Sequence, residues 1–262
     1  CIRDRYGIKK ATILDNTGAW RDEDGLKQHV KNPSVERVIV TAPGLGKVKN
    51  IVYGVNDDKA SPDDKMLAAA SCTTNAIVPV LKVIDENYTI QSGHIETVHA
   101  YTNDQNLIDN YHPSDRRGRS AALNLVITDT GAAKAVSQIM PEMKGKLTAN
   151  AIRVPTPNVS LAIMNLNVKK SVSVEELNKC FREVAFHSKL KTTIDYTNAI
   201  DAVSSDFYSN EFAVVFDSQA TISNFNSVTI YCWYDNEYGY SKQVVRLLKK
   251  VLGINLIRYP KQ

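Results

Sequence analysis

The residues best suited to chemistry are a cysteine and the small hydroxyl side chains around it. A short apolar run, Leu67–Ala70, leads into Ser71-Cys72-Thr73-Thr74-Asn75, and an apolar helical pattern follows. This order predicts that Cys72 lies at a helix N-terminus, where unpaired amide groups and the helix dipole favour a thiolate. The hydroxyl groups could cap that helix or hold an anion there. The alternative is a buried, unreactive cysteine beside an ordinary helix cap.

A histidine that could serve this cysteine ends the strand-like segment His94–His99. If that strand passes the start of the helix, His99 can take the proton of Cys72 as a general base. The alternative is a hydrogen-bonded structural histidine. The other histidines share no metal-ligand spacing, so no metal site is expected. The four cysteines, Cys1, Cys72, Cys180 and Cys232, lie far apart without a C-x-x-C pair, which favours a reducing, cytoplasmic compartment.

Further along the chain lie groups that are suited to binding phosphate. Arg116-Arg117-Gly118-Arg119 is followed by Thr128-Asp129-Thr130-Gly131 at the start of a helical pattern, and Arg153 closes a strand. Arginines, hydroxyls and a helix N-terminus are typical of phosphate sites. A solvated loop is the plainer interpretation, and a nucleic-acid patch has little support because few aromatic residues interleave for stacking. Gly44-Leu45-Gly46-Lys47 lacks the spacing of a phosphate loop and is expected to be a tight turn.

The composition sets limits on the class of protein. The 262 residues are 43% apolar and 23% charged, with a net charge of +4, which is typical of a globular protein. The mild positive charge suits an anionic ligand without requiring nucleic acid. No stretch approaches the ~20 apolar residues that span a bilayer. A membrane protein and an acidic scaffold are therefore excluded.

The elements that position these residues change in kind near residue 72. Before it, a helical segment (Glu23–Val30) alternates with a buried strand (Val35–Val40) and a second short apolar run (Ile51–Val55), which favours a parallel sheet in an α/β layer. After it, strands predominate and helices stand apart, which favours an α+β region with a mainly antiparallel sheet. The expected strands are His94–Tyr101, Leu147–Val154, Val159–Val168 and Ser227–Tyr234, and the expected helices are Thr73–Glu86, Ala132–Met140, Val174–Phe186 and Glu237–Leu252.

One alternative class is a papain-like hydrolase. Cys72, His99 and Asn236 occur in the cysteine, histidine, asparagine order of such enzymes. The C-G-[SA]-C-[WY] signature is absent, however, and a hydrolase would explain neither the phosphate-binding groups nor the α/β start.

Five motifs resemble those of the glyceraldehyde-3-phosphate dehydrogenase family, in the family's order and near its spacing. The similarity runs from Thr17 to Val251. The motifs are Ser71-Cys72-Thr73-Thr74-Asn75, Val98-His99-Ala100, Thr130–Val136, Arg153–Ser160 and Trp233–Tyr240.

The resemblance implies an NAD(P)-dependent phosphorylating aldehyde dehydrogenase of glycolysis or gluconeogenesis. Cys72 would attack the aldehyde of glyceraldehyde 3-phosphate, and His99 would act as base and polarise the oxyanion. Hydride transfer would leave a thioester, which inorganic phosphate would convert to 1,3-bisphosphoglycerate. NAD is the expected cofactor, and NADP stays open because Asn110-Tyr111 stands where strictly NAD-dependent members often have Leu-Pro.

The resemblance also assigns residues and domains. Asn236 would hold the nicotinamide carboxamide, Thr41 would line the cofactor site, and the loop from Tyr101 to Leu125 would pack across subunits of a homotetramer. No membrane or nucleic-acid partner is expected. Phosphate contacts would come from Ser71, Thr73, Thr102, Arg117, Thr130, Gly131 and Arg153, with Arg116 and Arg119 as rivals of Arg117. The implied fold is a partial Rossmann-type parallel sheet, residues 1–72 of the NAD(P)-binding domain, then a catalytic domain of residues 73–236 and a C-terminal helix, 237–262, that returns to the first domain.

The sequence departs from the family at several points. It contains no G-x-G-x-x-G turn after a strand, and it lacks the acidic residue that follows such a turn in a dinucleotide-binding fold. Because the sequence also opens on Cys1, it looks truncated and is expected to bind NAD poorly. Ala76 replaces a frequent second cysteine, and Asp129 stands where Ser or Thr is usual. Erythrose-4-phosphate dehydrogenase is an alternative because Asn103–Gln105 and Tyr111–Pro113 resemble that branch. A truncated relative that is inactive or binds RNA is another.

Overall fold

The computed structural model describes residues 5–254, so Cys1 lies outside it. The described residues form two compact units. One consists of the chain up to Ser71 together with the residues from Gln243 onward, and the other is Cys72–Lys242. Helix α6 (Tyr238–Val251) contributes residues to both units.

The first unit is built on a parallel sheet of four strands. Their order is β1 (Ala11–Asp15), β2 (Val35–Val40), β4 (Met66–Ala68) and β3 (Lys49–Asn50), and every neighbouring pair is parallel. Helix α2 (Glu23–Val30) begins where the Asp22 side chain accepts a hydrogen bond from the Gly25 amide, at 2.8 Å. Its buried Leu26 packs with Val38, Val40 and Ala68 into an apolar core. The expected α/β layer with a parallel sheet is confirmed.

Two details of this unit differ from the sequence-based expectation. Strand β1 was not predicted, and its five residues are mostly half-buried, so it shows no clean burial pattern. The apolar run Ile51–Val55 is not a strand. It bends back on itself because the Asn56 side chain accepts the Val52 amide at 2.7 Å, and the strand here is the two-residue β3 just before it.

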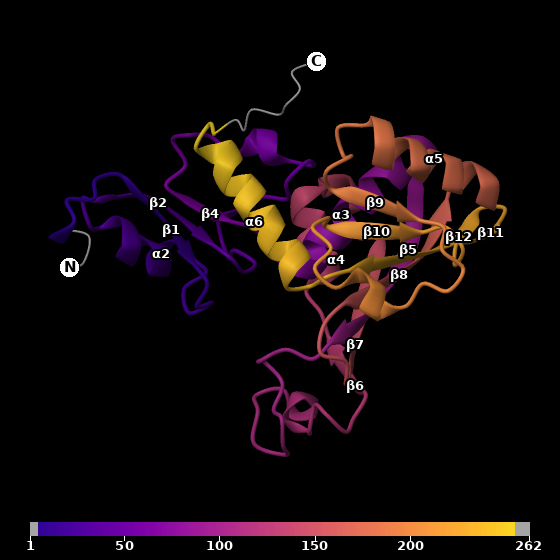
Figure 1. The fold of residues 1–262 in the computed structure, drawn as a ribbon, viewed down its shortest axis with the longest axis horizontal. Coiled ribbons are helices and arrows are strands. Elements are labelled where there is room, and N and C mark those ends of the chain that lie inside the picture. The colour runs from indigo at the N-terminus through magenta and orange to yellow at the C-terminus, as the bar shows by residue number, and fades with distance from the viewer. Residues whose placement is uncertain (1–4, 255–262) are drawn as a thin grey trace. The chain divides into compact units, whose positions relative to one another are not determined.

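The second unit is built on a mixed sheet in which most neighbours are antiparallel (Figure 1). The strand order is β6-β7-β5-β8-β12-β10-β9, with β11 paired to β12, and only β5–β7 and β9–β10 are parallel. This confirms the expectation of a mainly antiparallel sheet. The strands are β5 (Ile90–Ala100), β6 (Val126–Asp129), β7 (Leu147–Val154), β8 (Ser160–Val168), β9 (Ile194–Thr197), β10 (Val214–Asp217), β11 (Ile222–Asn224) and β12 (Ser227–Tyr234).

Three helices pack against this sheet: α3 (Cys72–Tyr88), α4 (Ala132–Ile139) and α5 (Val174–His187). Residues from Thr73 to Leu81 of α3 are all buried, as expected of a helix inside a core rather than on its surface. Alternate residues of β8 and β12, such as Met164 and Ile230, are also buried, which follows from the two-residue period of a strand.

One edge of this sheet collects the ends of several strands. Strands β5 and β7 are parallel and in register, so that His99 pairs with Arg153 near their carboxyl ends. Strand β8 starts at this edge with Ser160, because it pairs antiparallel with β5, and β12 ends there because Tyr234 pairs with Ser160. The loop between β5 and β6 extends beyond β6 and β7 in Figure 1.

The sequence missed the short strands of this unit. Strands β6, β9, β10 and β11 are each three or four residues long, too short to show a hydrophobic period. Within residues 5–254, no helix combines the length and the apolar character needed to cross a bilayer.

Candidate active site

Cys72 is the first residue of α3 and is half-buried. Burial raises the pKa of its thiol above the ordinary value. The hydroxyl and the amide of Thr73 bond to the sulfur, and together with the positive charge of Arg153 they oppose this rise without cancelling it. The donors at the helix start therefore favour the thiolate, as the sequence predicts, while burial acts in the opposite direction and leaves the pKa of Cys72 raised.

His99 faces this thiol from β5. Its Nε2 atom lies 3.6 Å from the Cys72 Sγ atom, and the side chain is buried. Burial and the charge of Arg153 lower the pKa of His99 to about 4. Both pKa shifts favour the uncharged forms, a thiol and a neutral imidazole, and a neutral imidazole can act as a base toward a thiol.

Arg153 lies beside His99 because β5 and β7 are parallel and in register. Its Nη1 atom is 2.8 Å from His99 Nδ1 and 3.2 Å from the Ala100 carbonyl oxygen. Burial lowers the pKa of Arg153, and so does the charge of Arg117. An arginine nevertheless stays protonated in a protein, so this is a permanent positive charge at the site.

Arg117 is the member of the Arg116–Arg119 segment whose charge acts on both His99 and Arg153. It lies in a short 3-10 turn, η2 (Asp115–Gly118). Its Nε donates to the Thr128 hydroxyl at 2.9 Å, its Nη2 donates to the Asp129 carbonyl at 3.1 Å, and its Nη1 pairs with Asp104. The structure thus brings Arg117 and Arg153 to one place.

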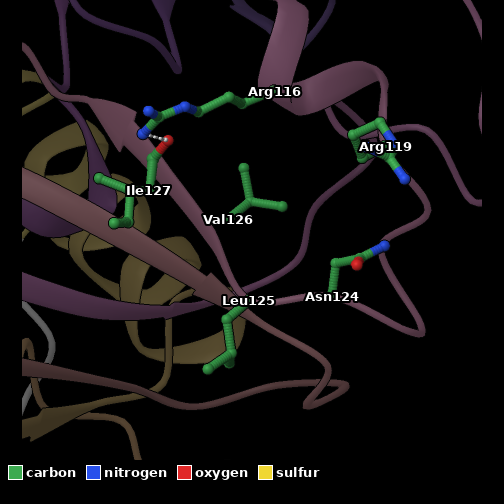
Figure 2. A pocket seen from close by; sticks show the side chains of 6 residues that line it. All are labelled: Arg116, Arg119, Asn124, Leu125, Val126 and Ile127. Atoms are coloured by element: carbon green, nitrogen blue, oxygen red, sulfur yellow. Dashed lines mark hydrogen bonds between the residues drawn. The ribbon is translucent and has the colours of Figure 1, made fainter.

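Arg116 and Arg119 line a different hollow, of about 280 Å³, together with residues 124–127. Figure 2 shows Arg116 reaching to the main-chain oxygen of Ile127, at 3.4 Å. Arg119 is exposed and pairs with Asp109 at 3.3 Å. Of the three arginines, only Arg117 is among the charges that act on His99 and Arg153.

Thr130 and Gly131 precede α4, as the sequence suggests. Gly131 is the N-cap residue of this helix, and the Thr130 hydroxyl accepts the Ala132 amide at 3.3 Å. Thr102 is half-buried just beyond the end of β5. Thr73 is buried, and its hydroxyl lies 3.1 Å from the Tyr234 hydroxyl.

Ser71 and Thr41 belong to the other unit. Ser71 is the residue immediately before Cys72. Thr41 follows β2, and its hydroxyl lies 3.0 Å from the Asn16 side-chain oxygen and 3.3 Å from the Asp15 carbonyl.

Asn236 is held by Ser160, a residue for which the sequence predicts no role. The Ser160 hydroxyl donates to Asn236 Oδ1 at 2.8 Å and accepts the Ala100 amide at 3.1 Å. Ser160 also bonds to the buried Tyr234, whose hydroxyl in turn contacts Thr73. A hydrogen-bonded chain thus joins Asn236 to the residue next to Cys72. Only the pairing of β8 with β12 brings these groups together, and no spacing in the sequence indicates it.

This arrangement does not fit the papain-like alternative. In that mechanism the asparagine orients the histidine, as the aspartate does in a serine protease triad. Here Asn236 bonds to Ser160, while His99 Nδ1 contacts the Ala100 carbonyl and Arg153. The arrangement provides instead a thiol nucleophile, a neutral base and two cations.

Comparison with known proteins agrees with this geometry. A family model described as "Glyceraldehyde 3-phosphate dehydrogenase, C-terminal domain" matches residues 71–236. A "Glyceraldehyde-3-phosphate dehydrogenase-like protein" of Pseudomonas aeruginosa is 56% identical over 98% of this chain. The chain belongs to the glyceraldehyde-3-phosphate dehydrogenase family.

Other members of the glyceraldehyde-3-phosphate dehydrogenase family are more distant. The chloroplastic glyceraldehyde-3-phosphate dehydrogenase GAPA1 of Arabidopsis thaliana is 43% identical over 90% of this chain. Glyceraldehyde-3-phosphate dehydrogenase 2 of Bacillus subtilis is 41% identical over 91% of it and is covered to 70% of its own length. The chain spans only 56% of the Pseudomonas protein and 59% of the Arabidopsis one.

Proposed function

We propose that this chain carries the catalytic site of a phosphorylating glyceraldehyde-3-phosphate dehydrogenase. The observation that carries the proposal is the contact of the Cys72 Sγ atom with the His99 Nε2 atom, 3.6 Å apart, with Arg153 directly beside the ring. A thiol needs a base to attack an aldehyde, and a phosphorylated substrate and free phosphate need cations. The names of the relatives support the same reaction.

In the first step Cys72 attacks the aldehyde carbon and forms a hemithioacetal. His99 Nε2 takes the thiol proton as the C–S bond forms, and the protonated ring can then donate to the new oxyanion. The low pKa of His99, about 4, makes the protonated ring a strong acid that readily returns its proton.

The two arginines and the start of α4 hold the phosphate groups. Arg117 and Arg153 repel each other, since the charge of one lowers the pKa of the other, and an anion between them removes that repulsion. We assign the substrate phosphate and the inorganic phosphate to pockets formed by Thr102, Arg117 and Arg153, and by Ser71, Thr73, Thr130 and Gly131.

The cofactor we assign is NAD(P). Asn236 fits a nicotinamide carboxamide because Ser160 binds its oxygen, which leaves the amide nitrogen to donate to a carbonyl. Thr41 would line a cofactor site in the first unit, whose parallel sheet we assign to the NAD(P)-binding domain. A bound NAD(P) supplies the hydride acceptor, and inorganic phosphate then attacks the resulting thioester of Cys72 to release the acyl phosphate.

The full-length protein tests this proposal. We expect NADH or NADPH to form only when glyceraldehyde 3-phosphate and phosphate are both present, and Cys72→Ser to abolish the reaction. Cys180→Ser is the matched control, because Cys180 lies half-buried on α5. Cofactor reduction that does not depend on phosphate would contradict the proposal. Faster turnover of erythrose 4-phosphate than of glyceraldehyde 3-phosphate would identify erythrose 4-phosphate as the substrate.

A further inference from the structure

The residue before Asn236 carries a buried carboxylate that three main-chain amides bind. Asp235 is only 2% exposed. Its Oδ1 atom accepts the Glu237 amide at 3.0 Å and the Tyr238 amide at 2.7 Å, and its Oδ2 atom accepts the Ser209 amide at 2.8 Å. Hydrogen bonds from amides to a carboxylate are stronger than those between neutral groups, so this side chain firmly joins two parts of the chain.

The two bonds of Oδ1 close the turn in which Asn236 lies. The turn joins the end of β12 to the start of α6, and the bond from Asp235 to the Glu237 amide spans Asn236. An aspartate bonded to the amide three residues later, here Tyr238, is typical of the start of a helix. The main chain of Asn236 is thus held by this turn, while the Ser160 hydroxyl holds its side-chain oxygen.

The bond of Oδ2 ties this turn to a segment 26 residues earlier in the sequence. We call residues 207–212 the anchor segment; it follows the 3-10 turn η4 (Ser204–Phe207) and leads to β10. Ser209 has a φ of +60°, a left-handed conformation that is strained for a serine. A residue keeps such a conformation only where its surroundings hold it, and the bond from its amide to Asp235 is one such restraint.

Two further contacts join the anchor segment to the elements on either side of Asn236. Phe207 stacks on Trp233 of β12, with 5.4 Å between ring centroids and 16° between ring planes. A Cβ atom at Gly239, in the first turn of α6, would come within 2.6 Å of the Phe212 carbonyl oxygen, so glycine is required for this close approach. The anchor segment therefore contacts the strand before Asn236, the turn that contains it and the helix after it.

We propose that Asp235 is a positioning residue for the nicotinamide half of the cofactor, because it ties the turn of Asn236 to the anchor segment. The Ser160 bond fixes how the Asn236 amide group is rotated, and the Asp235 bonds fix where its main chain lies. Both are needed to hold the amide nitrogen at the carboxamide oxygen. This inference rests on the proposed function in assigning that carboxamide to Asn236, and Asp235 acts through Asn236 rather than on the cofactor.

Asp235→Asn separates this role from that of a helix cap. Asparagine keeps an oxygen for the two amides of the turn and caps a helix as well as aspartate does, but its Nδ2 is a donor and cannot accept the Ser209 amide. In the full-length protein we expect calorimetry to show a Kd for NAD that is about 3- to 10-fold higher, the effect of one neutral hydrogen bond. The Kd for ADP-ribose, which lacks the nicotinamide, should stay within about twofold.

Two control variants match Asp235→Asn. Asp217 is also buried, accepts two main-chain amides through Oδ1 and accepts the Trp233 indole through Oδ2, but its turn does not contain Asn236. Asp217→Asn should therefore leave both Kd values unchanged. Ser209→Gly keeps the amide that binds Asp235 and suits a positive φ, so it should also leave both values unchanged.

The unmodified protein provides a test that does not depend on the folding of any variant. If Asp235 couples the anchor segment to Asn236, a ligand that holds Asn236 must also stabilise the anchor segment, because coupling is reciprocal. We expect hydrogen exchange of the amides of residues 207–212 to slow several-fold with saturating NAD and to change less with saturating ADP-ribose.

Equal weakening of NAD and ADP-ribose binding in Asp235→Asn would show that Asp235 only stabilises the fold, and would overturn the proposal. Unchanged NAD binding, absence of NAD binding in the unmodified protein, or equal protection of the anchor segment by both ligands would also overturn it. NAD binding that depends on Asp235 in a protein without dehydrogenase activity would refute the proposed function and leave this inference standing. Dehydrogenase activity with NAD binding that is insensitive to Asp235→Asn would do the opposite.

Discussion

Burial shifts the pKa values of two groups in the site, Cys72 and His99, in the directions that favour their uncharged forms. Burial raises the pKa of Cys72 and lowers that of His99 to about 4, and both shifts favour a proton on the sulfur rather than on the ring. A protonated thiol is also less susceptible to oxidation than a thiolate, because the thiolate is the form that oxidants attack. A protonated Cys72 is thus a weaker nucleophile than a thiolate and is also less readily oxidised.

The pKa of His99 makes the fold sensitive to acid. In the unfolded chain the ring has its ordinary value of 6.5, so it binds a proton between pH 6.5 and 4 that the folded protein does not bind. The free energy of unfolding therefore falls as pH decreases through this window, by on the order of 3 kcal/mol. We expect urea denaturation to show a lower free energy of unfolding at pH 4.5 than at pH 7 in the unmodified protein. In His99→Phe this decrease between pH 7 and pH 4.5 should be smaller by about the same amount. Parallel pH dependences of the two proteins would refute this assignment.

Ser160 tests the hydrogen-bonded chain behind the site. The side chain is buried, and Ser160→Ala leaves the Ala100 amide and Asn236 Oδ1 without this partner. We expect a loss of about 1–3 kcal/mol in the free energy of unfolding and a higher KM for NAD(P), because Asn236 can then rotate.

Thr229→Ala is the matched control for Ser160→Ala. It removes a hydrogen bond of the same length, 2.8 Å to Asn165, but on an exposed part of the sheet, and should cost no more than about 0.5 kcal/mol. Equal losses in the two variants would show that burial of the Ser160 bonds carries no extra energy.

The individual residues proposed to react could be predicted from the sequence, whereas the residues that hydrogen-bond behind them could not. Cys72 and His99 could be identified because a cysteine before a helix and a histidine ending a strand are visible in a one-dimensional pattern. The direction of the Cys72 pKa shift could not, since it depends on burial by residues distant in sequence. Ser160 and Tyr234 were missed for the same reason, because their bonds cross between strands.

Among the elements, β5 is the one on which the site depends most. Its residue Gly93 lies so close to β8 that a Cβ atom would come within 2.6 Å of Leu166 Cδ2 and 2.7 Å of the Asn165 carbonyl oxygen. A backbone oxygen cannot move aside as a flexible side chain can. Glycine at this position therefore lets β5 and β8 pair along most of their length.

Gly93→Ala is expected to force the two strands apart. We expect a loss of about 1–3 kcal/mol in the free energy of unfolding, typical of overpacking, measured by urea denaturation. Gln91→Ala, two residues earlier in the same strand and exposed, should leave stability within about 0.5 kcal/mol. A Gly93 variant as stable as the Gln91 variant would refute the steric argument.

Long elements could be predicted from the sequence and short ones could not. The bounds of α2, β2, β7 and β12 agree with those expected, because each shows several periods of its pattern or clear flanking signals. Strands such as β6 and β9 exist because neighbours in the sheet pair with them, and four residues carry too little pattern to show it.

At the scale of the whole molecule, the loop between β5 and β6 is a surface that exposes several large apolar side chains. Five large apolar side chains there are 66% to 87% exposed: Leu107, Ile108, Tyr111, Leu123 and Leu125. Exposed apolar groups concentrated on one segment are typical of an interface rather than of free surface. This supports the sequence-based expectation that the loop packs across subunits of a homotetramer, which we propose for this protein.

Charge placed in that loop should prevent assembly of the proposed homotetramer. We expect Ile108→Asp combined with Leu123→Asp to convert the full-length protein from tetramers to smaller species in sedimentation velocity experiments. Ile200→Asp is the matched control, since Ile200 is 89% exposed on another part of the same unit and should leave assembly unchanged. A native protein that sediments as a monomer would refute the homotetramer itself.

The parallel pairing of β5 with β7 also determines where this chain can gain or lose residues over evolutionary time. Side chains of a strand alternate between two faces, so deleting one residue inside β5 would turn His99 away from Cys72 and unpair it from Arg153 at once. Residues added to the loop beyond Ala100 change neither register. Insertions and deletions in the loop therefore leave His99 in place, whereas a deletion of one residue in β5 displaces it, although the two segments adjoin.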